Sequence, residues 1–354
     1  MIRILPGAGR RLVLGAVLGG ALVALPQALP PLEAQSPERA GDGVLGRVVV
    51  VVVSGTAGED LAEAIEVELI TLGEAASVGV ERASAPGGRA EFSVPTDPML
   101  THVPRVRYQG VQYFGDPVLL SPELPAAEVS VRVFERAQEP PPLSIRETTV
   151  TVLALDRAAA ELTLVREDLV ENPSDRVYVG PPPSGVTLRL PLPERTLDAS
   201  GLNEEGSFQL GSGTLDASLP LRPGITPVVT TYRVGYDPAR DGYRLRVTAP
   251  LPTARVEVLV PDRFVEELAP LDAAEHGPAA QLEGELALVA RRGEAARAGE
   301  GTLVELRGLA GSTASNPLTD GRGPFAATAL ALVLLPAAAW ALQRAGSRRG
   351  VRKP

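Results

Sequence analysis

Short runs of alternating apolar and polar residues recur through the middle of this chain, and they constrain its fold more than any other feature. Every second residue of a run is apolar, which is the spacing of side chains along one face of a β-strand. A sheet with one face packed on a core and the other face in water is typical of antiparallel β structure. The alternating runs are Ile65–Leu69, Val129–Val133, Val186–Leu190, Tyr243–Val247 and Ala254–Val258, and Val44–Val53 is a β-branched run.

Turn-forming residues lie between these runs. Ala85–Gly88, Arg222–Gly224 and Asp241-Gly242 each combine Gly with Pro or Asp, a composition typical of tight turns. Many short strands at this spacing predict β-sandwiches and not alternating strands and helices.

A proline triplet marks the clearest boundary. Residues 138–142 read Gln-Glu-Pro-Pro-Pro, which favours a stiff, extended chain that cannot donate ladder hydrogen bonds. We therefore expect a linker at 138–142, between a sandwich over 44–137 and a β-rich region over 143–309 that holds one or two domains. Pro181–Pro183 is either a second linker or, more simply, a long loop within that region.

Further expectations concern the end of the β-rich region. Arg263–Glu275 is the segment that we expect to form a soluble helix. Leu282–Ala290 and Thr302–Arg307 are expected to pair as closing strands. Residues 310–323, which are rich in Ser, Thr, Gly and Asn, are expected to form a tether next to the membrane.

The first 34 residues have the pattern of a secretory signal peptide. Three arginines precede Leu12–Leu25, fourteen residues without a charge, and prolines and the small residue Ala34 follow. A retained membrane anchor is the alternative. A fourteen-residue helix is about 21 Å long, short of the roughly 30 Å hydrocarbon core, so we expect 1–34 to be a cleaved signal peptide.

A second apolar stretch lies near the C-terminus. Pro324–Leu342 has nineteen residues without a charge, and as a helix it is about 28 Å long, enough for one crossing. Five basic residues and no acidic residue follow, and the positive-inside rule places such a tail in the cytoplasm. We therefore expect a transmembrane helix at 324–342 and a basic tail at 343–354, whose topology is set by Arg344, Arg348, Arg349, Arg352 and Lys353.

Charge divides the chain in the same way. Of the 34 basic and 43 acidic residues, the segments 1–34 and 324–354 hold eight basic and one acidic, which leaves 26 basic and 42 acidic and a net charge of −16 over 35–323. Such a surface repels phosphate backbones, which disfavours nucleic acid as a partner. The fold class that we expect is mainly β, with two or three β-sandwich domains and one C-terminal transmembrane helix.

The chain offers few side chains for catalysis. It has no Cys, and His102 and His276 lie in different predicted domains, outside any His-x-x-x-His pattern. It has no Gly-x-Ser-x-Gly nucleophile elbow, and its only Lys, Lys353, cannot serve a phosphate-binding loop. We therefore expect no cofactor and no enzyme, with both His structural or on the surface; a hydrolase stays as an alternative.

Acidic residues give one candidate for a metal site. Asp237 and Asp241 could hold Ca²⁺ together with backbone carbonyls of their loop. The same string is typical of an ordinary hairpin connection, which is the interpretation that we prefer. Charged pairs in the β-rich region, among them Arg166-Glu167, are interpreted as surface charge.

Aromatic residues give a second candidate site. Tyr108, Tyr113 and Phe114 surround a Gln109-Gly110 turn, so at least one ring could be exposed and bind a glycan. Packing in the core or at a sheet edge is the alternative, and it is the interpretation that we prefer. A second set shares one strand face and is expected to lie in the core: Val228, Thr230, Tyr232, Val234 and Tyr236.

The first predicted domain resembles a known family. Gly46-Arg47-Val48 gives a Gly-x-Val pattern, Gly88–Phe92 follows a tight turn, and Arg107–Tyr113 looks like a strand and hairpin. Over 44–137 these residues resemble the transthyretin-like, carboxypeptidase regulatory-like β-sandwich of bacterial surface proteins, although Phe92 comes later than usual. The resemblance implies a non-catalytic accessory module without peptidase activity.

These features predict a non-catalytic, single-pass protein of a bacterial cell membrane, with the β-domains outside and the C-terminus in the cytoplasm. The absence of Cys and of an Asn-x-Ser/Thr acceptor fits an exported bacterial chain. An envelope protein is the expected partner, contacted through exposed strand edges or loops. A ligand-binding module for a glycan or Ca²⁺ is the alternative function.

Overall fold

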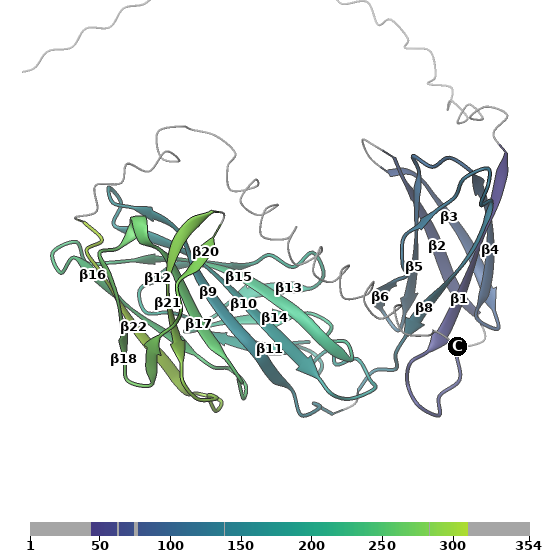
Figure 1. The fold of residues 1–354 in the computed structure, drawn as a ribbon. Helices are drawn as coiled ribbons and strands as arrows, with labels where there is room; N and C mark the ends of the chain where they lie inside the picture. The colour runs from purple at the N-terminus through teal and green to yellow at the C-terminus, as the bar shows by residue number, and fades with distance from the viewer. Residues whose placement is uncertain (1–43, 62–63, 74–76, 138, 283, 311–354) are drawn as a thin grey trace, which may run out of the picture. The chain divides into compact units, whose positions relative to one another are not determined.

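The computed structural model describes residues 44–61, 64–73, 77–137, 139–282 and 284–310, and these residues are mainly β, as predicted (Figure 1). Within these ranges, the one helical element is a single 3₁₀ turn, Asp262–Phe264. The strands form two groups, which we call the first module (44–137) and the second module (143–309).

The first module consists of two sheets. Strand β1 is the centre of a three-stranded sheet in the order β4-β1-β8, and the second sheet has the order β3-β2-β5-β6, with β7 also paired to β5. The strands are β1 (Leu45–Ser54), β2 (Ala64–Leu72), β3 (Ser77–Pro86), β4 (Arg89–Pro95), β5 (Thr101–Tyr108), β6 (Val111–Phe114), β7 (Val118–Leu119) and β8 (Ala126–Val133).

The second module has one large sheet and two small ones. The large sheet has the order β12-β15-β10-β9-β17-β21-β19, with β20 also on β21, and the small sheets have the orders β11-β14-β13 and β16-β22-β18. Their strands are β9 (Ser144–Asp156), β10 (Glu161–Asn172), β11 (Leu188–Pro191), β12 (Thr196–Gly201), β13 (Ser207–Leu210), β14 (Thr214–Ser218), β15 (Gly224–Gly235), β16 (Gly242–Thr248), β17 (Val256–Pro261), β18 (Glu267–Leu271), β19 (Ala274–His276), β20 (Ala280–Leu282), β21 (Glu285–Arg292) and β22 (Gly301–Arg307).

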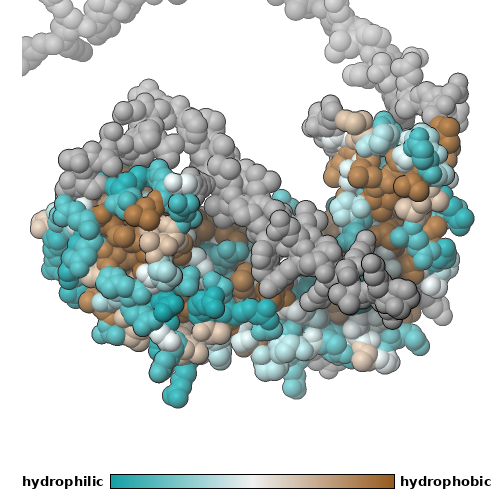
Figure 2. All heavy atoms as spheres, viewed as in Figure 1, coloured by the Kyte–Doolittle hydropathy of each residue, from teal (hydrophilic) through white to brown (hydrophobic). Residues whose placement is uncertain are grey.

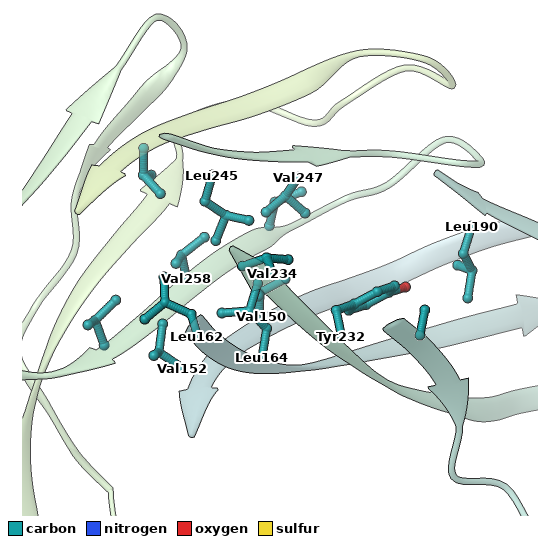
Figure 3. Close-up of a cluster of buried hydrophobic side chains, with 14 of the residues drawn as sticks. Val150, Val152, Leu162, Leu164, Leu190, Tyr232, Val234, Leu245, Val247 and Val258 are labelled. Carbon is teal, nitrogen blue, oxygen red and sulfur yellow. The ribbon is translucent and has the colours of Figure 1, made fainter. Parts of the chain in front are cut away.

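The apolar positions of the alternating runs form the cores. In β2 and β8 the buried residues are every second one, as the alternation predicts. One hydrophobic cluster fills the first module, and a single larger cluster runs through the second module. Figure 3 shows part of the second cluster, in which Leu245 and Val247 from β16 lie over residues of the large sheet. The expectation that Tyr232 and Tyr236 are core residues is confirmed.

The segment after β10 returns to the first module. Val177 is fully buried and belongs to the hydrophobic cluster of the first module. Its N–H donates to the carbonyl of Glu135 and its carbonyl accepts the N–H of Ala137, both at 2.8 Å. Residues 139–142 contain no strand, and Pro181–Pro183 lies in the loop between β10 and β11.

The expected helix over Arg263–Glu275 is wrong. After the 3₁₀ turn the chain forms β18 and β19, and β18 pairs along β22 from Glu267 to Leu271. Pro270 explains the outcome, because a proline inside a helix removes one hydrogen bond and clashes with the preceding turn. At the edge of a sheet, by contrast, a proline is tolerated.

The expected pairing of the two closing strands is also wrong. Strands form at both places, as β21 and β22, but β21 pairs with β17, β19 and β20, whereas β22 pairs with β16 and β18. Residues 293–300 carry the chain from one sheet to another. Alternation predicts a strand and its buried face, and it does not predict the neighbouring strand.

Several expectations fall outside the described residues. They are the signal peptide at 1–34, most of the tether at 310–323, the transmembrane helix at 324–342 and the basic tail at 343–354 with its five cations. Among the residues that the structure does describe, no helix is long and apolar enough to span a membrane.

Candidate functional site

One end of the first module exposes a group of large apolar side chains. Of the eleven large hydrophobic residues exposed in the described chain, eight belong to this smaller module. Figure 2 shows hydrophobic surface on it, including the place where the described chain begins. Strand register and loops bring six of the eight to one end, which we call the apolar end: Val44, Leu45, Leu72, Met99, Leu119 and Leu124.

The β4-β1-β8 sheet places the first part of the apolar end. Leu45 pairs with Pro95 at the end of β4, and the Val44 carbonyl accepts hydrogen bonds from the backbone N–H and the hydroxyl of Thr96. Because β8 runs parallel to β1, its first residue, Ala126, pairs with Arg47 at the same end. The start of β1, the end of β4 and the loop before β8 therefore meet.

The second sheet places the rest. Thr101 pairs with Leu72 on one side and with Leu119 on the other, so the three side chains form one row across β2, β5 and β7. Residues that pair directly across antiparallel strands point to the same face. The row lies on the solvent side, because the neighbouring row of Thr71, His102 and Val118 points into the core.

Short-range hydrogen bonds hold the two loops of the apolar end. The Met99 N–H donates to the Asp97 carboxylate at 2.9 Å, and Leu100 closes the same turn onto the Asp97 carbonyl. Ser121 and Leu124 exchange backbone hydrogen bonds in the other loop. Met99 and Leu124, at 60% and 71% exposure, are therefore held in solvent by ordered turns.

A close backbone approach adds to this rigidity. A Cβ at Gly46 would lie 2.5 Å from the Pro125 carbonyl oxygen and 2.7 Å from the Thr96 methyl. Only glycine therefore lets the start of β1 fit between the two loops. The Gly-x-Val pattern at Gly46 has a packing reason at this end of the module.

The charge around the apolar end is acidic. Asp97, Asp116 and Glu123 lie in its loops, and within the described residues none of them forms an ion pair. The Ser121 hydroxyl lowers the pKa of Glu123, so this carboxyl is ionised at neutral pH. The loop segments 95–100 and 115–125 contain no Arg, Lys or His.

His102 lies directly under the apolar end. It is fully buried in β5, its Nδ1 lies 3.0 Å from the Thr71 hydroxyl, and its Nε2 has no hydrogen-bond partner among the described residues. Burial lowers the pKa of His102, more than the nearby Pro95 carbonyl raises it. The other imidazole, His276, is exposed on β19 of the second module. His102 is thus a core residue within a strand and not in the loop that its sequence neighbours suggest.

The structure separates the three predicted ligand-binding aromatics. Gln109 and Gly110 form the expected turn, both with positive φ, which is typical of a type I′ hairpin. Tyr108 and Tyr113 point into the core at 7% and 4% exposure, and Phe114 alone is on the solvent side, at 57%. Their rings therefore do not form one binding platform.

The two buried tyrosines are held by specific contacts. The Tyr108 hydroxyl donates to the Glu135 carboxylate, and burial together with Glu135 raises the pKa of Tyr108 to about 12. Tyr113 packs on Phe134 with ring centroids 6.1 Å apart, and burial raises its pKa. The Arg222 guanidinium lies 5.4 Å from the centre of the Tyr113 ring. Packing in the core, the alternative interpretation, describes both residues.

The predicted Ca²⁺ candidates are occupied by contacts of their own loop. The Asp237 carboxylate accepts the Ala239 N–H and lies 3.5 Å from Arg240, while the Asp241 carboxylate accepts the Ala310 N–H. No group of three or more His, Asp or Glu able to hold a metal occurs in the ranges that the structure describes. The loop does reverse the chain, since Asp237 and Gly242 form an isolated antiparallel bridge, but β15 and β16 on either side belong to different sheets and do not continue it as a hairpin.

The interpretation of Arg166 as surface charge is wrong. Arg166 and Asp168 are buried on the core side of β10, and the guanidinium donates to both carboxylate oxygens, at 2.7 and 3.0 Å. The Thr148 hydroxyl donates to the same carboxylate at 2.6 Å, and Arg166 also donates to the Thr248 carbonyl. The cavity beside Arg166 measures about 10 Å³, room for about one water molecule, so this cluster has no space for a substrate.

No protein-family model and no curated protein matches the chain. Solved structures that are similar to it include an M1 zinc metallopeptidase from Deinococcus radiodurans, with 13% identity, 46% of this chain and 42% of that chain covered, and a TM-score of 0.29. A mutant of a two-domain M1 zinc metallopeptidase bound to L-tryptophan has 12% identity and a TM-score of 0.30, with 50% of this chain and 44% of that chain covered. The chain spans less than half the length of these structures, and the TM-scores are too low to support an argument about fold or activity.

Proposed function

We propose that this chain is a non-catalytic, single-pass envelope protein that presents its β-modules outside the cytoplasmic membrane and binds a protein partner through the apolar end. The signal peptide, the transmembrane helix and the basic tail expected from the sequence are part of this proposal. So is membership of the first module in the carboxypeptidase regulatory-like group, with which its two packed sheets agree.

The observation that carries the proposal is the apolar end itself. Large exposed apolar patches are rare on monomeric soluble proteins and mark interaction sites. Four of its residues, Val44, Leu45, Leu119 and Leu124, each expose more than 60% of their surface. Ordered turns hold the backbone at Met99 and Leu124 in place, so binding need not order the backbone there.

The buried titratable groups support a structural role over catalysis. The Arg166 guanidinium and the Asp168 carboxylate bond to each other, and the His102 imidazole is enclosed beneath Thr71. Each of these groups is buried within a core. A general base or a nucleophile must reach its substrate, and these side chains do not.

The proposal is tested by purifying the full-length protein, with its partners, from the envelope of its native host. Three chains are compared: the wild type, the variant Met99→Ser/Leu119→Ser/Leu124→Ser, and the matched control Leu197→Ser/Leu210→Ser/Leu286→Ser, which changes exposed leucines of the second module. We expect one protein to be retained by the wild type and the control and lost from the first variant. Equal retention by all three chains would refute the proposed site.

A further inference from the structure

We infer that the partner bound at the apolar end presents apolar side chains flanked by Arg or Lys. This inference rests on the proposed function and specifies the chemistry of the partner. It follows from the acidic residues that surround the apolar end and from the absence of cations in the loops that form it.

Three carboxylates in the loops of the apolar end differ from the acidic residues on the strands. On the β4-β1-β8 sheet of the first module, two exposed acidic residues are paired across strands, Glu91 with Arg47 at 2.7 Å and Glu128 with Arg89 at 3.1 Å. Asp97, Asp116 and Glu123 have no such partner within the described chain. Within the described ranges, three carboxylates without an ion-pair partner therefore lie in the loops of the apolar end.

Charge disfavours a lipid surface or a second copy of the chain as the occupant of the apolar end. An anionic lipid surface would be repelled by these carboxylates, and no loop cation offsets them. A second copy of the chain, docked through the same end, would bring the two acidic rims together, and like charges oppose such a contact. A partner that carries cations beside its apolar residues gains both apolar burial and charge complementarity.

The acidic residues of the apolar end alternate along the loops with its exposed apolar residues. Asp97 belongs to the turn that holds out Met99, Glu123 is next to Leu124, and Asp116 lies two residues before β7, which carries Leu119. Each carboxylate is thus close in sequence to one exposed apolar side chain. A segment in which basic and apolar residues are interspersed matches this arrangement.

The test uses the full-length protein and two synthetic peptides of equal length with leucines at the same positions. One peptide carries arginines between the leucines and the other carries glutamates. We expect the arginine peptide to bind, to protect 95–100 and 115–125 from hydrogen exchange, and to weaken as salt is raised. We expect the affinity for the glutamate peptide to be lower by a factor of about ten or more.

A charge variant and a matched control complete the experiment. Asp97→Asn/Asp116→Asn/Glu123→Gln should lower the affinity for the arginine peptide about tenfold, because three exposed charge pairs are lost. The amide that replaces the Asp97 carboxylate keeps an oxygen that can accept the Met99 N–H. The control Asp198→Asn/Asp272→Asn/Glu204→Gln changes exposed acidic residues of the second module and should bind as the wild type does.

Several results would overturn the inference: equal affinity for both peptides, binding of neither, an unchanged affinity of the charge variant, or binding of vesicles rich in phosphatidylglycerol. A dimer that dissociates in the Met99→Ser/Leu119→Ser/Leu124→Ser variant would identify a second copy as the occupant and would also overturn it. The outcome can also separate the two proposals. A partner that is lost from that variant, and that contacts the wild-type apolar end without Arg or Lys, would refute the basic chemistry and leave the proposed function standing.

Discussion

Arg166 and Asp168 form a two-point ion pair inside the second module, although they are only two residues apart on one strand. Residues at this spacing share a face of β10, and that face also carries the buried Leu164 and Val170. Burial of a charged pair is tolerated because the guanidinium and the carboxylate satisfy each other, with Thr148 and the Thr248 carbonyl completing the network.

Removing one partner of this pair should destabilise the protein strongly. Asp168→Ala leaves a buried guanidinium without its anion, and we expect a loss of about 3–5 kcal/mol in the free energy of unfolding. Urea unfolding followed by circular dichroism measures the loss. The control Arg47→Ala removes an exposed pair with Glu91 and should stay within about 1 kcal/mol of the wild type. Equal effects of the two variants would contradict the account.

Acid should weaken the first module through His102. Because burial lowers the pKa of His102, the unfolded chain binds a proton that the folded chain does not as the pH falls below about 6.5. The contribution of the neutral His102 side chain to the free energy of unfolding is therefore complete above that pH and is lost as the pH falls below it. In His102→Asn the decrease in stability between neutral and mildly acidic pH should be smaller than in the wild type, whereas in His276→Asn, at an exposed site, it should be unchanged. An unchanged decrease in His102→Asn would count against the assignment.

The buried tyrosines should lose their phenolic protons at higher pH in the folded protein than in the unfolded chain. Burial raises the pKa of Tyr108, Tyr113, Tyr232, Tyr236 and Tyr243 above the usual 10. Since the unfolded chain loses these protons first, stability is complete below pH 10 and falls above it. Absorbance at alkaline pH should show the phenols of the native protein losing their protons at higher pH than the phenols of the unfolded protein. Guanidinium-unfolded protein is the control, and titration near pH 10 in both states would contradict the burial of these rings.

Calcium should leave the thermal midpoint unchanged. Ca²⁺ takes about six to eight oxygen ligands, whereas the Asp237 and Asp241 carboxylates are bonded to the N–H groups of Ala239 and Ala310. Melting curves with millimolar Ca²⁺ and with a chelator should coincide. A higher midpoint in Ca²⁺ that disappears in Asp237→Asn would restore the calcium-binding alternative.

The sequence predicts the strands better than it predicts their partners. Alternation in β2, β8 and β16 gives the correct buried faces, because a side chain's face depends only on its own strand. Pairing depends on residues far away along the chain, and the predicted pairing of β21 with β22 is therefore wrong. The position of Arg166 in the sequence does indicate burial, because it continues the alternation of Leu162 and Leu164. Its charge instead favours the surface, which is why the interpretation from the sequence is wrong.

The apolar end has almost no signal in the sequence. Met99, which is followed by Leu100, and Leu124 lie in short Pro-rich loops, and a few exposed apolar residues in such loops are ordinary in any chain. They become neighbours of Leu72 and Leu119 only through the register of two sheets, joined where Gly46 fits between loops. Sequence reasoning instead selected the aromatics near Gln109, of which only Phe114 faces solvent.

The most direct test of the central claim is site-specific photo-crosslinking in living cells of the native host. A photoreactive amino acid replaces Leu119 at the apolar end in one strain and Leu210 in the second module in another, since both side chains are exposed. We predict one discrete adduct with a protein of different sequence from Leu119 and none from Leu210. No adduct from Leu119, or the same adduct from both positions, would contradict the claim that the apolar end is the docking site.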